Sequence, residues 1–230
     1  FIDISKAHLY APVDKGTKAY VDLPPECGKP GTCGLLQFWL YGMRPASHGW
    51  EAEYTRQLES LGFVAGAASP CCFYRKRDDV ACVVHGDDFT FCGLEEDLQW
   101  ISALMATWFE IKVRAMLGPD KKDDKEVVIL GRTVRWKEWG IEWEEDKKHR
   151  ELLMERFGFD KKTKALNQNG DSEVHQGEEW EEELLVKAEA TEFRAAAARL
   201  NFLSQDSPEL QYPAKEISQE MATPEIGAWK

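Results

Sequence analysis

Two short apolar segments on either side of a polar turn place the strongest constraint on how this chain can fold. The segments are residues 80–84 and 89–92, and the turn between them has the sequence His-Gly-Asp-Asp. Apolar segments of this length around a turn that contains Gly and Asp are typical of a β-hairpin. The sequence therefore predicts two antiparallel strands with the carboxylates of Asp87 and Asp88 at their connection.

The rest of the chain mixes strand and helix patterns first and then becomes helical. Strand patterns occupy residues 1–4 and a second hairpin within residues 126–143. Apolar residues at helical spacing predict helices at residues 50–61, 94–108, 146–157, 191–204 and 207–223. This order favours an α+β domain followed by a small helical module.

The chain is acidic, but its negative charge is concentrated in one segment. Its 230 residues include 29 Lys and Arg against 41 Asp and Glu, a formal net charge of −12. Taken alone, this balance argues against a nucleic-acid partner, because phosphates attract basic surfaces. However, residues 171–192 hold nine acidic residues and one basic residue. This segment is expected to be a solvated linker or a frayed helix start, so the overall charge does not exclude nucleic acid.

The cysteines follow no pattern of a metal centre or a disulfide framework. No CxxC pair occurs, and no His lies at zinc-finger spacing from a pair of cysteines. We therefore expect reduced, buried thiols at Cys27, Cys33, Cys71, Cys72, Cys82 and Cys92.

A third carboxylate, Asp3, ends the strand pattern at the start of the chain. If the two strands are neighbours in one sheet, Asp3 lies beside Asp87 and Asp88. Three clustered carboxylates repel one another and need a cation to stay ionised together, and oxygen ligands favour a hard ion such as Mg²⁺. Mg²⁺ held by few carboxylates keeps positions for phosphate oxygens, which points to phosphoryl transfer with no substrate specified. The alternative is an unrelated α+β domain whose Asp-Asp pair is only a solvated turn.

Five segments, in the same order along the chain, resemble motifs of the Ty1/copia-type retrotransposon reverse transcriptases. They are FIDISKAHL (1–9), similar to the first catalytic motif; LYGMRPASHGW (40–50), similar to LYGLKQAPRxW; VVHGDDF (83–89), similar to the YVDD hairpin; ILGR (129–132), similar to the FLG hairpin; and residues 193–214, similar to the late helices of the family. The HGDDF variant resembles divergent copia-like elements of unicellular eukaryotes.

The resemblance implies an α+β fold with a polymerase palm, an antiparallel sheet with packed helices, followed by a small helical thumb or connection module. The palm would span residues 1–145, a further helix residues 146–170, the acidic linker residues 171–192, and the thumb or connection helices residues 193–230. The family's basic fingers would precede Phe1 and are largely missing, and its RNase H module would follow Lys230.

The implied activity is that of an RNA-directed DNA polymerase, a segment of a Pol polyprotein that adds nucleotides to a primer 3′-OH with two Mg²⁺ ions, or Mn²⁺ in their place. Asp3 and Asp87 would hold the ions, with Asp88 in support and the Ile4 carbonyl near the second ion. His8 stands where the family usually has a Phe or Tyr plate that rejects the ribose 2′-OH.

Other implied positions contact the nucleic acid. Gly42, Arg44 and Pro45 would run under the nascent base pair and template, with Pro45 in place of the usual Gln. Gly86 replaces a branched residue near the primer end. The implied partners are an RNA or DNA template, a DNA primer, deoxynucleoside triphosphates and the integrase and RNase H modules, with no membrane. The implied location is intracellular, in cytoplasmic virus-like particles and in the nucleus.

A second hypothesis is a decayed or repurposed retroelement segment that folds and binds nucleic acid without catalysis. The missing fingers and the departures at His8 and Pro45 motivate it. Two basic runs, residues 75–77 and 147–150, are candidates for contacting a phosphate backbone. The competing interpretation of each run is a solvated turn or helix face.

Overall fold

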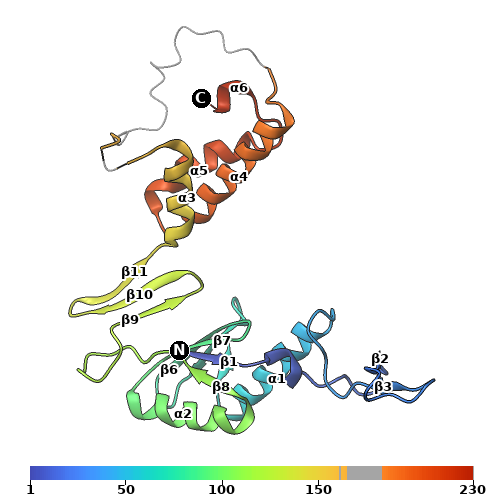
Figure 1. Ribbon diagram of the computed structural model, residues 1–230. Coiled ribbons are helices and arrows are strands. Elements are labelled where there is room, and N and C mark those ends of the chain that lie inside the picture. Colours follow the sequence, from blue (N-terminus) through green and yellow to red (C-terminus); the bar gives the residue numbers. More distant parts are fainter. Residues whose placement is uncertain (161, 165–182, 230) are drawn as a thin grey trace. The chain divides into compact units, whose positions relative to one another are not determined.

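Residues 1–160, 162–164 and 183–229 are described by the computed structural model, which has the α+β fold predicted from the sequence (Figure 1). The chain divides into two compact units, Phe1–Met116 and Leu117–Lys230. The second hairpin, which the family resemblance would assign to a palm of residues 1–145, therefore belongs to the second unit. In the part of the chain that the structure describes, no helix is long and apolar enough to cross a membrane.

The first unit is built on a six-stranded antiparallel sheet with the strand order β4-β5-β6-β7-β1-β8. The strands are β1 (Ile2–Ile4), β4 (Val64–Ala65), β5 (Cys72–Arg75), β6 (Val80–His85), β7 (Asp88–Cys92) and β8 (Ile111–Val113). The predicted hairpin is confirmed as β6 and β7, in which His85 pairs with Asp88 around a two-residue turn. Gly86 has a φ of 64°, which suits the first central position of such a turn.

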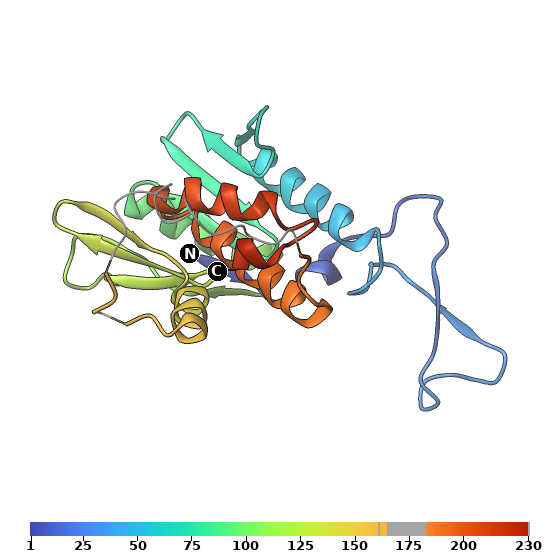
Figure 2. The same cartoon turned by 90° about the horizontal axis from the view of Figure 1, so that it is seen from above.

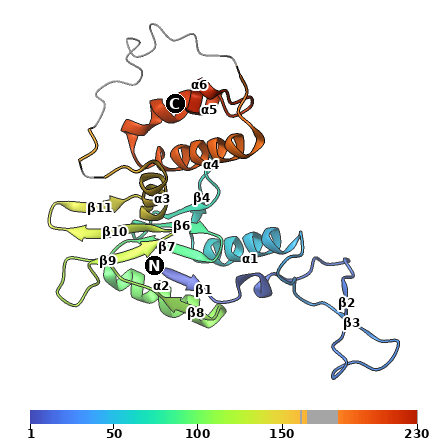
Figure 3. The ribbon, with the colours of Figure 1, turned by 45° about the horizontal axis from the view of Figure 1, so that its top comes forward.

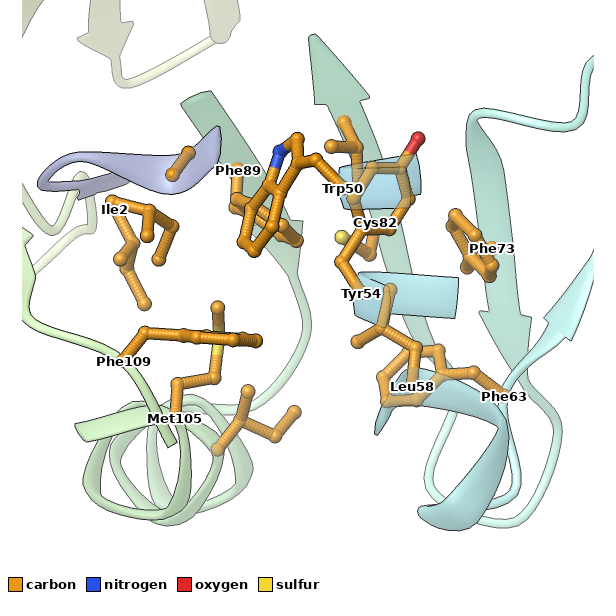
Figure 4. Packing of buried hydrophobic residues seen from close by; sticks show 14 of the residues in the cluster. Ile2, Trp50, Tyr54, Leu58, Phe63, Phe73, Cys82, Phe89, Met105 and Phe109 are labelled. Atoms are coloured by element: carbon orange, nitrogen blue, oxygen red, sulfur yellow. The ribbon is translucent and has the colours of Figure 1, made fainter. Parts of the chain in front are cut away.

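Two helices cover one face of this sheet. They are α1 (Ala46–Ser60) and α2 (Glu95–Trp108), and their buried side chains lie in one cluster with the inward side chains of the strands (Figure 4). Along β6, Val80, Cys82 and Val84 are buried whereas the residues between them are exposed. This alternation leaves the opposite face of the sheet open. Burial of each large apolar side chain contributes about 1.5–3 kcal/mol to stability.

A short 3-10 helix and a two-stranded ribbon complete the first unit. The 3-10 helix, η1 (Ala7–Tyr10), follows β1, and β2 (Tyr20–Asp22) pairs with β3 (Cys33–Leu35). Figure 2 shows the ribbon extending away from α1. The side chains of Tyr20 and Leu35, which are cross-strand partners, are exposed.

The second unit combines a three-stranded antiparallel sheet with a group of helices. The sheet has the order β11-β10-β9 and contains the predicted second hairpin. Its strands are β9 (Glu126–Ile129), β10 (Arg132–Lys137) and β11 (Gly140–Glu144), and the helices are α3 (Lys147–Phe157), α4 (Lys187–Leu203), η2 (Pro208–Leu210), α5 (Gln211–Gln219) and α6 (Ile226–Trp229). Helices α4 and α5 lie side by side (Figure 3).

The acidic segment predicted as a linker or frayed helix start is only partly described. Residues 171–182 lie outside the described residues. Helix α4 begins at Lys187, four residues before the predicted start at Thr191, so the end of the segment is helical. Phe193 and Ala197 of α4 are buried in a small cluster with Leu185 and Ala190.

One arginine joins the sheet of the second unit to its helical part. The Arg132 Nε donates to Asp206 at 2.7 Å, and the guanidinium lies 4.8 Å from the centre of the Phe202 ring. The indole N–H of Trp143 donates to the second oxygen of Asp206 at 3.3 Å. The side chains of Arg132 and Asp206 are 14% and 12% exposed, so the pair is largely desolvated.

The prediction that the cysteines are buried is wrong for most of them. All six are free; Cys82 is buried, Cys72 is half-buried, and Cys27, Cys33, Cys71 and Cys92 are exposed. The alternation of the sheet explains part of the difference. Cys82 points into the core, whereas Cys92 pairs with the exposed Ala81 and faces solvent.

Alkaline unfolding should report on Tyr54 of α1. Burial, together with the smaller effect of the nearby Glu51, raises the pKa of Tyr54 from 10.0 to about 12. The folded state thus keeps the phenol proton at pH values where the unfolded state has lost it, so the free energy of unfolding should fall as pH rises from about 10 to about 12. Urea unfolding at several pH values should show a shallower fall for Tyr54→Phe. Tyr20→Phe, which removes an exposed hydroxyl, should keep the wild-type slope, and equal slopes for all three proteins would contradict the expectation.

The junction at Arg132 should be far more sensitive than an exposed ion pair. Asp206→Asn leaves the Arg132 guanidinium buried without a countercharge and should cost about 3 kcal/mol. Glu192→Gln removes the partner of Arg156, where both side chains are 53% exposed. This control should cost less than about 1 kcal/mol. Urea unfolding followed by circular dichroism measures both values, and similar costs would show that the junction is not desolvated in solution.

Candidate active site

Strand pairing places Asp3 directly opposite Asp88. Strand β1 lies between β7 and β8, and Asp3 pairs with Asp88 on one side and with Lys112 on the other. Residues that are opposite each other in antiparallel strands project from the same face. Because Ile2 and Ile4 on either side of Asp3 are buried in the core, Asp3 and Asp88 project from the open face. The structure therefore brings these two predicted site residues together.

The third carboxylate, Asp87, lies in the turn of the hairpin and is exposed. Its carbonyl accepts a hydrogen bond from the backbone amide of Ile4 at 2.9 Å, which ties the turn to the end of β1. Ile4 is fully buried, so it can contribute to a site on the open face only through its backbone. The turn thus holds Asp87 next to the strand that carries Asp3.

A cation already lies among these carboxylates. Arg114 donates to Asp3 Oδ2, and its Nη2 lies 3.6 Å from Asp88 Oδ1. The hydrogen bond to Asp3 is the main cause of a raised pKa at Arg114, to which Asp88, Asp3 and Asp87 also contribute. At Asp88, burial raises the pKa, Arg114 lowers it, and Asp87 and Asp3 raise it again. All three carboxylates therefore act on one guanidinium.

Arg114 is not among the site residues predicted from the sequence. Its only sequence signal is the spacing of Lys112 and Arg114, two residues apart at the end of a short strand, which places both on one face. The amide of Arg114 donates to the Phe1 carbonyl at 2.8 Å, so the backbone of this residue is fixed beside β1. Its ion pair with Asp3 joins residues 111 positions apart, which no local pattern reveals.

Trp50, on the core side of the sheet, also holds the turn that carries Asp87. The indole N–H of Trp50 donates to the Gly86 carbonyl at 2.8 Å, and the side chain is only 2% exposed. Its ring contacts Tyr54, Phe89 and Phe109 edge-on, with ring centres 5.1–6.3 Å apart (Figure 4). Sequence periodicity identified Trp50 as a residue of a helix but gave no sign of this hydrogen bond.

His8 faces the turn that precedes α1. Its ring centre lies 4.5 Å from that of Tyr41, with the ring planes inclined by 31°. The His8 Nδ1 is buried and has no hydrogen-bond partner among the described residues. The structure therefore brings the predicted plate residue next to the segment that resembles LYGLKQAPRxW.

The other predicted positions in that segment form a turn and a helix start. Gly42 has a φ of 83°, a conformation that favours glycine. Arg44 is exposed, and Pro45 immediately precedes α1. Within the described part of the chain, no hydrogen bond or ion pair joins Arg44 to Asp3, Asp87 or Asp88, so the structure does not bring it to the carboxylates.

The three carboxylates fit a hard divalent cation in their chemistry, although a guanidinium now pairs with two of them, Asp3 and Asp88. Carboxylate oxygens are the ligands that Mg²⁺ prefers, and Asp3, Asp87 and Asp88 supply them from β1, from the turn and from the start of β7. Arg114 stands where their charge needs a cation. Over the described ranges, no group of three or more His, Cys, Asp or Glu residues is arranged as a metal site with the side chains in these positions.

The basic runs have mainly local partners. Arg75 is 4% exposed, forms an ion pair with Asp78 and lies over the rings of Phe63 and Trp100 at 5.3 and 4.6 Å. It is therefore not available to a phosphate backbone. In the second run, Lys147 pairs with Glu144 at 3.1 Å and Arg150 with Glu145 at 2.9 Å.

Comparisons with known proteins identify no relative of this chain. Neither a scan against protein-family models nor searches of curated proteins and of solved structures find a match.

Replacement of Trp50 should loosen the turn that carries Asp87. Trp50→Phe removes the hydrogen bond to Gly86, and Trp39→Phe is the matched control, because the Trp39 Nε1 is buried without a partner among the described residues. Both variants lose ring volume, so Trp50→Phe should cost about 1 kcal/mol more than Trp39→Phe. Hydrogen–deuterium exchange should also be faster across residues 81–92 only in Trp50→Phe. Unchanged exchange there would show that the indole does not hold the turn.

Proposed function

We propose that this chain is the palm and thumb segment of a reverse transcriptase of the Ty1/copia type, an RNA-directed DNA polymerase. The observation that carries the proposal is the pairing of Asp3 with Asp88 beside a turn that holds Asp87. An Asp-Asp pair in an isolated turn would not need a third carboxylate on the neighbouring strand. The ordered motifs support the same assignment, because the first and third of them supply these three residues.

In this proposal, Asp3 and Asp87 hold two divalent cations, Mg²⁺ or Mn²⁺, and Asp88 supports them. When bound, the cations would supply the positive charge that lowers the pKa of the primer 3′-OH and neutralises the triphosphate. The hydrogen bond from Trp50 to Gly86 holds the backbone of the turn in position. Burial of Ile2 and Ile4 makes the side chain of Asp3 project from the open face of the sheet. These contacts keep the carboxylates in place before any substrate arrives.

The neighbouring residues would position the nucleotide and the duplex. His8, braced by Tyr41, would lie against the sugar of the incoming nucleotide, and the turn from Gly42 to Pro45 would run under the nascent base pair. The open face of the sheet would leave space for the primer end near Gly86. The helices of the second unit would form the thumb or connection and grip the duplex by its backbone.

The proposed partners follow from this activity. They are an RNA or DNA template, a DNA primer, deoxynucleoside triphosphates, and the integrase and RNase H modules of a Pol polyprotein. The proposed location is the same as that of such elements, in cytoplasmic particles and in the nucleus.

Primer extension on an RNA template tests the proposal. Asp3→Asn and Asp87→Asn should each reduce Mg²⁺-dependent nucleotide incorporation by about 100-fold or more, since even residues that only support metal ligands cost 10–100-fold. Asp22→Asn, which changes an exposed carboxylate on β2, should leave the rate unchanged. The assay uses this chain alone and extended by a fingers segment. Full incorporation by Asp87→Asn would mean that the metal site is assigned wrongly.

The second candidate is a retroelement segment that binds nucleic acid without catalysis. The observations that favour it are the guanidinium among the carboxylates and the departures at His8 and Pro45. Salt-dependent binding of a primer–template without incorporation would support this candidate. Measurable incorporation that depends on Asp3 would exclude it.

A further inference from the structure

We propose that Arg114 is an internal counter-ion that competes with divalent cations for the carboxylates of Asp3 and Asp88. The inference deepens the proposed function, because it rests on the same carboxylates as a cation site. In this inference, Arg114 controls whether the carboxylates are free to bind a metal ion. Arg114 belongs neither to the ordered motifs nor to the predicted site residues.

Without a cation, the site would hold three negative charges close together. Asp3 and Asp88 are cross-strand partners with side chains only 20% and 22% exposed, and Asp87 lies beside them in the turn. Like charges this close destabilise one another unless a positive charge is shared between them. Arg114 supplies that charge from the end of β8, so the sheet can form with these carboxylates ionised before any metal ion binds.

Arg114 and a metal ion need the same carboxylate oxygens. The guanidinium donates to Asp3 Oδ2 and lies 3.6 Å from Asp88 Oδ1. A divalent cation at those oxygens would be repelled by a guanidinium in contact with them, so the two occupy the site in turn. An arginine stays protonated at all physiological pH values, so it can leave only by moving and not by losing its proton.

The side chain of Arg114 is able to move away from the carboxylates. Its backbone is fixed by the hydrogen bond to Phe1, but its side chain is 42% exposed, about twice as much as the carboxylates that it contacts. Water can therefore solvate the displaced guanidinium. Metal binding then exchanges one cation for another at little cost to the fold.

Titration of Mn²⁺ into the full chain, followed by calorimetry, tests the competition. Arg114→Gln should bind Mn²⁺ at least about fivefold more tightly than the wild type, the lower end of typical coupling between two ligands. Arg77→Gln, at the opposite end of β6 where Arg77 pairs with Asp78 at 3.0 Å, should bind like the wild type. Equal affinities of the wild type and Arg114→Gln would overturn the inference while leaving the cation site intact. Absence of Mn²⁺ binding by all three proteins would instead overturn the proposed site itself.

A second measurement does not depend on the folding of a variant. Mg²⁺ is titrated into the ¹⁵N-labelled wild-type chain, and the Nε–H resonance of Arg114 is followed by NMR. Displacement should move this resonance to the position typical of solvent-exposed arginines as Mg²⁺ binds. A stationary Arg114 resonance, while the carboxyl carbons of Asp3 and Asp88 respond to Mg²⁺, would show that the ion binds with the guanidinium in place and would overturn the inference.

Discussion

The pairing of β1 with both β7 and β8 is the interaction on which the rest of the first unit depends. This three-residue strand buries Ile2 and Ile4 on one face and presents Asp3 on the other. The backbone amide of Ile4 also donates to the carbonyl of Asp87, which attaches the turn of the β6–β7 hairpin to this strand. A single short strand thus links the hydrophobic core to the charged open face, and the carboxylates come together only when the sheet forms.

The aromatic core on one side of the sheet holds the backbone of the site in place, whereas the charged side chains on the other side are less tightly packed. Trp50 contacts several rings and at the same time donates to the Gly86 carbonyl, so the packing of the core is transmitted to the backbone of the turn. The charged side chains above are partly exposed and can rearrange. A rigid backbone with partly exposed charged side chains suits the proposed exchange of the Arg114 guanidinium for a metal ion.

Much of the first unit could be predicted from local sequence, whereas the long-range contacts could not. The hairpin was predictable, because two short apolar segments and the Gly-Asp turn between them lie within a few residues. Asp3 was a reasonable candidate because it lies in a second short strand pattern, which could pair with this hairpin. Arg114 was missed because its importance depends on the position of β8 beside β1, a consequence of strand order that local patterns do not contain. The burial of the cysteines was predicted wrongly because burial in a strand depends on which face a side chain projects from, and not only on the residue type. Cys82 and Cys92 are the same residue type but lie on opposite faces of the sheet.

The alternation along β7 has a consequence for where this part of the chain tolerates an added residue. A residue added to the turn at Gly86 and Asp87 can be accommodated as a longer loop, because hairpins also form with three-residue connections. A residue added within β7, between Asp88 and Phe89, would instead exchange the two sides of the strand, so that Phe89 would face water and Thr90 would enter the core. The hairpin therefore separates a connection that can change in length from a strand whose length is fixed by its own core.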